Sequence, residues 1–222
     1  MKKYKNKQKY CKEFYEIYAK KTLEYCYNKS WKNCFDETKE CPDLQSEQLD
    51  VGVEVTSSIN KNERQINSLF NKYIAGQIDY KKMKNKIVFL GGYVSKFKNS
   101  VIVSPAEGLC DFKNHIDELV DIIVYKTKIK LPHYKKFSKN ILYIFTGGEL
   151  FNRDDINDVC LLLRKELSNC ILNFDMYFIN CTDHIFIINL EQGLLDELII
   201  EDNMLIKLKS ESLKESEKLM NS

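Results

Sequence analysis

The chain has 222 residues, of which 44% are hydrophobic and 30% are charged. This balance is typical of a folded globular protein and argues against a disordered chain. Lysine and arginine number 34 against 32 acidic residues, so a nucleic-acid function would need a local basic cluster and not a general positive charge. No apolar run is long enough for a membrane span, so no membrane partner is expected.

The eight cysteines show neither a C-x-x-C pair nor zinc-finger spacing with the histidines. The first ten residues, MKKYKNKQKY, are basic and lack the apolar segment of a signal peptide. We therefore expect reduced, mostly buried thiols in a cytoplasmic protein. A disulfide framework is the alternative.

The first elements in chain order are a helix and a short strand. Apolar residues recur at helical spacing over 8–28, and a polar connection that includes Pro42 follows. Residues 49–56 are rich in valine, which predicts a strand, and Gly52 within it indicates a bulge or a close approach of another segment. Three further elements are expected before the middle of the chain: a helix over 61–75 and strands over 87–90 and 101–103.

The second half alternates helices and strands. A long amphipathic helix is predicted over 111–130 and ends before Pro132. The run ILYIF, residues 141–145, is apolar throughout, which predicts a central strand that is buried on both faces. The remaining elements are a helix to Leu167 beginning at Asp154 or Asp155, strands over 175–179 and 184–190, a further helical or mixed segment over 191–209 and a frayed polar tail.

This alternation predicts an α/β fold with a mixed central sheet flanked by helices. No repeat or linker divides the chain, so a single domain is expected over 1–222. Its core would cover about 8–190, followed by a C-terminal helical extension and the polar tail.

Two acidic residues, Asp43 and Glu54, form the candidate site. If residues 43–46 and 50–56 pair as a hairpin, the two carboxylates converge at one end, where they repel each other. A divalent cation removes that repulsion, and hard oxygen ligands suit Mg²⁺ or Mn²⁺. The carbonyl of Val55 is a third candidate ligand.

The spacing alone favours a plainer interpretation. Asp43 after a proline is common turn chemistry, and Glu54 can point to solvent from an edge strand. Glu47 and Asp50 lie close enough in sequence to take either role.

The pattern Pro42-Asp43, a gap, and then Gly52-Val53-Glu54-Val55-Thr56 resembles the core motif of the PD-(D/E)xK nuclease superfamily. The segment from Lys126 to Tyr134, followed by ILYIF, resembles the second half of divergent members. The resemblance implies a restriction-endonuclease-like fold and a Mg²⁺- or Mn²⁺-dependent site that cleaves phosphodiester bonds, with DNA the expected substrate ahead of RNA.

In the family pattern a lysine follows the second acid and stabilises the transition state, but this chain has Thr56 there. Three alternatives follow. A lysine from the 126–130 segment reaches the site, with Lys126 and Lys128 as the catalytic candidates and Lys130 as a third; or Thr56 suffices beside a well-bound metal; or the site is degenerate and the protein only binds.

The resemblance also implies a further metal ligand from an acid on the first helix. Glu16 and Glu13 rank ahead of Glu24 for this role, although a solvent-exposed helix face is the plainer interpretation of all three.

Six lysines fall within 126–139, interleaved with aromatic residues. Lysines can contact phosphates while aromatic rings stack on bases, so we assign nucleic-acid binding to Lys130, Lys135, Lys136 and Tyr134. A solvated basic helix end is the equal alternative.

The leading hypothesis is therefore a metal-dependent nuclease, with Asp43, Glu54, Thr56, Lys126 and Lys128 as catalytic residues. Its metal ligands would be Asp43, Glu54, Val55 and Glu16. The alternative is a catalytically degenerate module of the same fold that binds nucleic acid or protein. Both hypotheses are compatible with a homodimer.

Overall fold

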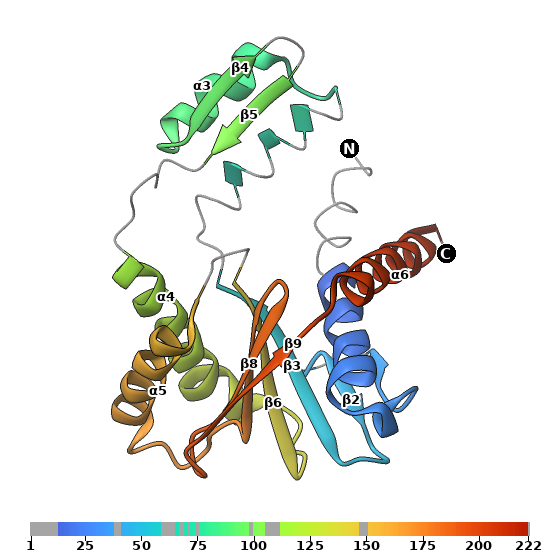
Figure 1. Ribbon diagram of the computed structural model, residues 1–222, viewed down its shortest axis with the longest axis vertical. Coiled ribbons are helices and arrows are strands. Elements are labelled where there is room, and N and C mark those ends of the chain that lie inside the picture. Colours follow the sequence, from blue (N-terminus) through green and yellow to red (C-terminus); the bar gives the residue numbers. More distant parts are fainter. Residues whose placement is uncertain are drawn as a thin grey trace. The chain divides into compact units, whose positions relative to one another are not determined.

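The computed structural model describes residues 13–37, 41–58, 65–66, 69–70, 72–73, 76–97, 100–104, 112–146 and 151–221 (Figure 1). The chain divides into two compact units. Unit 1 comprises Met1–Ser58 and Leu119–Ser222, and unit 2 comprises Ile59–Glu118. The sequence predicted one domain because no linker-like composition marks the two junctions.

A mixed sheet forms the centre of unit 1. Among the described residues it has seven strands in the order β1-β2-β3-β6-β7-β8-β9. Strand β3 pairs in parallel with β6, and β6 in parallel with β7, whereas the other neighbours are antiparallel. The strands are β1 (Asp36–Glu37), β2 (Leu44–Ser46), β3 (Val51–Ser57), β6 (Lys139–Phe145), β7 (Met176–Cys181), β8 (His184–Asn189) and β9 (Leu194–Ile199).

Helices cover both faces of this sheet (Figure 1). The helix at 13–22 and α6 (Asp202–Asn221) lie on one side, and α4 (Phe112–Tyr125) and α5 (Arg153–Leu167) lie on the other. Side chains alternate between the faces of a strand. Thus Tyr143 of β6 joins the core beside Tyr18 and Leu208, whereas Leu142 is buried on the opposite face. The α/β class, the mixed sheet and the central position of ILYIF are confirmed.

Two helices show how the sequence sets their ends. Helix α4 continues into a π-helical segment, η3 (Lys126–Lys130), and then a short 3-10 turn, η4 (Leu131–His133), which contains Pro132. Helix α5 begins after Asn152, whose side chain accepts from the Asp155 N–H while Asp155 accepts from the Asn152 N–H. This reciprocal cap explains why the helix starts near Asp154, as expected from the sequence.

Unit 2 contains helix α3 (Tyr80–Phe89) and a two-stranded antiparallel sheet of β4 (Tyr93–Phe97) and β5 (Ser100–Ser104). The strand predicted over 87–90 is wrong, because its residues belong to α3 and Leu90. Met83 and Ile87 are buried one helical turn apart and join Ile66 and Val94 in a small core. Of the helix predicted over 61–75, residues 65–66, 69–70 and 72–73 are described and are helical, and the rest lies outside the described residues.

The C-terminal part of the chain adds to the sheet and to the helices that cover it. Strand β9 pairs with β8 within the segment that was expected to be helical or mixed, so the sheet extends beyond residue 190. The tail that was expected to fray belongs to helix α6, in which Leu208, Ser212 and Ser216 are fully buried. Its burial against other elements, which no local pattern reports, stabilises the helix. No helix among the described residues is both long and apolar enough to cross a membrane.

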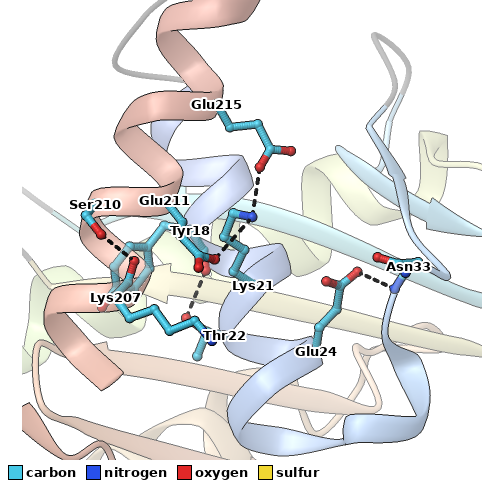
Figure 2. Close-up of polar contacts among 9 residues, drawn as sticks. All are labelled: Tyr18, Lys21, Thr22, Glu24, Asn33, Lys207, Ser210, Glu211 and Glu215. Carbon is cyan, nitrogen blue, oxygen red and sulfur yellow. Dashed lines mark hydrogen bonds and ion pairs between the residues drawn. The ribbon is translucent and has the colours of Figure 1, made fainter. Parts of the chain in front are cut away.

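An ion pair joins α6 to the helix at 13–22 (Figure 2). Lys21 Nζ lies 2.8 Å from Glu215 Oε2 and 3.8 Å from Glu211 Oε2. Burial lowers the pKa of Lys21, but the hydrogen bond and charge of Glu215 outweigh it, so the pKa is raised. The pair therefore contributes stability below the pKa of an unfolded-chain lysine and loses it as the pH rises through the raised value.

We expect Glu215→Gln to lower the unfolding free energy by about 0.5 kcal/mol at neutral pH, because the pair is partly exposed. The difference from the native chain should shrink at a pH above the Lys21 pKa. Urea denaturation at the two pH values measures this. Glu211→Gln is the matched control, and its longer contact should give a smaller effect; equal effects would contradict the assignment.

Candidate active site

The β2–β3 hairpin brings Asp43 beside Glu54. Leu44 pairs with Val53 in the antiparallel register, so Asp43 lies just beyond the last pair and opposite the continuing β3 strand. Its Oδ2 accepts a hydrogen bond of 2.9 Å from the Val55 backbone N–H. Both carboxylates are almost fully buried, with 5% of Asp43 and 4% of Glu54 exposed. The hairpin proposed from the sequence therefore forms, and its acids converge.

The absence of a side chain at Gly52 permits this hairpin to pack closely. A Cβ at this position would lie 2.5 Å from Phe137 Cδ2 and 2.7 Å from Pro42 Cγ. Backbone bonds from Lys135 N–H to the Cys41 carbonyl and from Lys139 N–H to the Asp50 carbonyl hold the same segments together. The close approach expected at Gly52 is thus the contact that fixes the segment after η4 against the site.

We expect Gly52→Ala to lower the unfolding free energy by about 1–3 kcal/mol, because the added methyl group overlaps the Phe137 ring and Pro42. Thermal or urea denaturation measures the loss. Phe137→Leu in the Gly52→Ala background should recover part of it by vacating space. A Gly52→Ala chain as stable as the native protein would contradict the packing.

A lysine from the other side of the chain reaches Glu54. Residues 54 and 142 are register partners on β3 and β6, and Leu142 lies on the sheet face opposite the core residue Tyr143. Lys126, the first residue of η3, follows helix α4, and its Nζ lies 2.6 Å from Glu54 Oε1. The Lys126 side chain is only 18% exposed. π-Helical turns are frequent at functional sites, and this one begins with the lysine that contacts the buried acid.

The environment of Glu54 opposes its ionisation on balance. Burial raises the pKa of the carboxyl, and the charge of Asp43 raises it further, whereas Lys126 and the Tyr134 hydroxyl lower it. The net pKa is raised. Burial and the neighbouring Glu54 also raise the pKa of Tyr134 far above its ordinary value, so its hydroxyl stays protonated. Lys126 thus offsets only part of what disfavours the ionisation of Glu54.

The raised pKa of Glu54 makes the unfolding free energy depend on pH. From the ordinary value of 4.5 up to the raised pKa, the folded chain retains a proton that the unfolded chain has released. Ionisation of Glu54 therefore lowers the unfolding free energy as the pH rises. Glu54→Gln removes this titration, so the unfolding free energy of the variant minus that of the native chain should increase as the pH rises from 4.5 through the raised pKa of Glu54.

Urea denaturation across that range measures the difference. Glu47→Gln, which changes an exposed carboxylate after the same β2 strand, is the control and should show no such increase. A difference that falls with pH would contradict the interpretation, since it would mean that Lys126 outweighs burial.

The oxygen atoms at the β2–β3 hairpin are of the kind that binds a hard divalent cation. Glu54 Oε2 is buried and has no hydrogen-bond partner among the described residues. The N–H and C=O of one strand residue point to the same edge, so the Val55 carbonyl points to the edge where Asp43 accepts from the Val55 N–H. Two carboxylates and a carbonyl are ligands that Mg²⁺ or Mn²⁺ accepts.

A third acid does not join this pair. Within the described parts of the chain, no group of three or more His, Cys, Asp or Glu side chains is arranged to hold a metal ion. Glu16 is buried on the helix that covers the other face of the sheet. Glu24 is also buried, but its Oε1 accepts from the Asn33 N–H at 3.1 Å (Figure 2). The structure therefore brings Asp43, Glu54 and Val55 together without Glu16.

The remaining predicted residues surround the site to different extents. Thr56 is half-buried and lies on the same strand face as Glu54, two residues further along. Lys128 is exposed and lies 3.8 Å from Glu166. Lys130 lies over the Tyr125 ring at 5.6 Å, Lys135 pairs with Glu47, and Lys136 is exposed.

Tyr134 has a different position from the one expected for base stacking. It is buried and interacts with Glu54 and Asp43. Tyr125, which is 49% exposed, presents a more accessible ring. No local signal in the sequence links Tyr134 to Glu54, because the two residues lie far apart along the chain and meet only after the sheet forms.

Comparisons of the chain with protein-family models, with curated proteins and with solved structures give no match. The geometry of the site therefore carries the functional argument.

Proposed function

We propose that this chain is a metal-dependent nuclease that cleaves phosphodiester bonds in DNA. The observation that supports this most is the ion pair of 2.6 Å between Lys126 Nζ and Glu54 Oε1, beside the buried Asp43. Two converging carboxylates and an ammonium group, brought together from separate elements in a buried location, are the groups that phosphodiester hydrolysis with a divalent cation needs.

The placement of the acids supports the resemblance to PD-(D/E)xK nucleases. Asp43 follows Pro42 directly before β2, and Glu54 lies on the next strand, β3. This is the arrangement that the motif implies, with one acid near a strand start and the second on the following strand. The mixed sheet flanked by helices agrees with a restriction-endonuclease-like fold as the finer form of the α/β class.

Each residue has a role in the proposed site. Asp43, Glu54 and the Val55 carbonyl would hold Mg²⁺ or Mn²⁺, which when bound supplies an activated water and neutralises charge on the phosphodiester. The Lys126 ammonium stabilises the negative charge that develops on the phosphoryl oxygens. The Tyr134 hydroxyl lowers the pKa of Glu54 and so offsets a small part of the effect of burial.

Lys126 is the best candidate for the role of the motif lysine. Thr56 occupies the motif position, but its hydroxyl carries no positive charge. Lys126 supplies the charge from η3, after α4, instead of from β3 itself. Of the other candidates, Lys128 lies 3.8 Å from Glu166 of α5, and Lys130 lies over the Tyr125 ring. A lysine that moved from the strand to the helix end would preserve the chemistry.

The alternative is a degenerate site in a nucleic-acid-binding or protein-binding module. Lys126 already contacts Glu54, and the described residues contain no group of three potential metal-ligating side chains. In this interpretation the ammonium group replaces the cation and stabilises the hairpin. The two functions differ in whether Mn²⁺ or Mg²⁺ binds at Glu54.

We expect the full chain to nick supercoiled plasmid DNA with Mn²⁺ or Mg²⁺, and Glu54→Gln and Lys126→Met each to reduce the rate at least about 100-fold, as removal of a single stabilising group does in other enzymes. Lys128→Met is the matched control, because Lys128 lies two residues after Lys126 in η3, and this variant should retain activity. Mn²⁺ should also raise the melting temperature of the native chain and not that of Glu54→Gln.

The results separate the two functions. Nicking that survives Glu54→Gln would exclude this site as its source. Absence of both nicking and the Mn²⁺-dependent stabilisation in the native chain would favour the degenerate module.

A further inference from the structure

Helix α3 of unit 2 presents an unusual concentration of positive charge. Lys81, Lys82, Lys84 and Lys86 are all exposed, and none forms an ion pair with a described residue. The helix contains no acidic residue; Asp79, which caps it, accepts from the Lys82 backbone N–H. Four like charges on ten residues repel one another, so an anionic partner would stabilise them.

The orientation of α3 leaves these lysines available. Met83 and Ile87 are fully buried in the small core of unit 2 and fix the inward face. Lys82, Lys86 and Phe89 follow one another at spacings of four and three residues, so they form one row along the outer face. Phe89 is 90% exposed. The row therefore combines two ammonium groups with an open aromatic ring.

The surrounding sequence has the same charge asymmetry. Residues 59–104 contain nine lysine or arginine residues and two acidic ones, although the whole chain has a net charge of only +2. The rest of the chain is thus net negative, and the positive charge is concentrated in this segment. Such asymmetry is typical of a region that meets nucleic acid.

We propose that α3 is a binding surface for single-stranded DNA, on which Lys82 and Lys86 contact phosphates and Phe89 stacks on a base. Lysine–phosphate contacts combined with stacking on aromatic rings are the usual means of binding single strands. A duplex keeps its bases stacked inside and offers no comparable partner for Phe89. The inference rests on the proposed nuclease function and defines its substrate as DNA with a single-stranded segment.

The connection along the chain supports a shared role. Strand β3, which carries Glu54, ends at Ser57, and unit 2 begins at Ile59. The chain returns through α4, whose end leads to Lys126. Unit 2 is therefore inserted in sequence between the two parts of the candidate active site.

An anionic membrane is the competing partner for a basic helix with an exposed phenylalanine. Membrane-bound helices of this kind insert a continuous apolar face, but the apolar face of α3 is already occupied by the core of unit 2. The exposed apolar residues of α3 are confined to its end, at Val88 and Phe89. The position of the exposed apolar residues therefore favours nucleic acid over a membrane as the partner of α3.

The test uses the full chain and a fluorescently labelled single-stranded DNA in EDTA, so that binding is measured without cleavage. We expect Lys82→Gln/Lys86→Gln to weaken binding about tenfold or more and to reduce the slope of log affinity against log salt by about 1.4, or about 0.7 for each lost phosphate contact. Lys214→Gln/Lys218→Gln, with the same spacing on exposed positions of α6, is the matched control and should bind as the native chain does.

Phe89→Ala separates single strands from duplexes. It should weaken binding to single-stranded DNA about fivefold or more and leave duplex affinity unchanged. The proposal would be overturned if the α3 double variant bound single-stranded DNA as tightly as the native chain, or if Phe89→Ala weakened binding to single-stranded and duplex DNA equally. It would also be overturned if the α3 substitutions weakened binding only to phosphatidylserine vesicles and not to DNA. Glu54→Gln should still bind DNA, so failure of the active site and failure of the α3 surface give different results.

Discussion

The burial of two carboxylates beside one lysine is the constraint on which the rest of this site depends. Asp43 and Glu54 lie almost entirely out of water, and burial together with the charge of Asp43 raises the pKa of Glu54. Lys126 offsets part of this, as the ion pair of 2.6 Å shows. The net pKa of Glu54 is still raised, so the charge balance is incomplete. A divalent cation would complete it, which is why the same arrangement that strains the fold supports the proposed chemistry.

Three parts of the chain must be in place before this cluster exists. The β2–β3 hairpin sets Asp43 against the Val55 N–H, and the parallel pairing of β3 with β6 places Glu54 in the centre of unit 1. The end of α4 then delivers Lys126. Phe137, in the segment after η4, packs closely against Gly52 and so holds the hairpin in position. The site therefore depends on the packing of several elements of unit 1, and a substitution that disturbs any of these contacts is expected to displace its residues.

The two units divide the tasks in the proposed function. Unit 1 holds the acids and Lys126, while the lysines of α3 in unit 2 have no partner among the described residues. The near-neutral total charge conceals this division, because the excess of basic residues over 59–104 is balanced by acids elsewhere. Buried charge that is held by defined contacts suits chemistry at a fixed position. Exposed, uncompensated charge suits a flexible polyanion, for which long-range attraction matters more than exact geometry.

The sequence by itself determined the α/β class, the central ILYIF strand, the acidic pair and the range that holds the lysine, because strand and helix periodicity and short motifs are local properties. It assigned 87–90 to a strand and the C-terminal tail to a frayed end, since neither segment's pattern reveals the core it packs against. Only the tertiary structure selected Lys126 from three lysines, buried Tyr134 beside Glu54 and kept Glu16 out of the acid group. Each of these outcomes depends on contacts between residues far apart in the chain, and burial sets their energies.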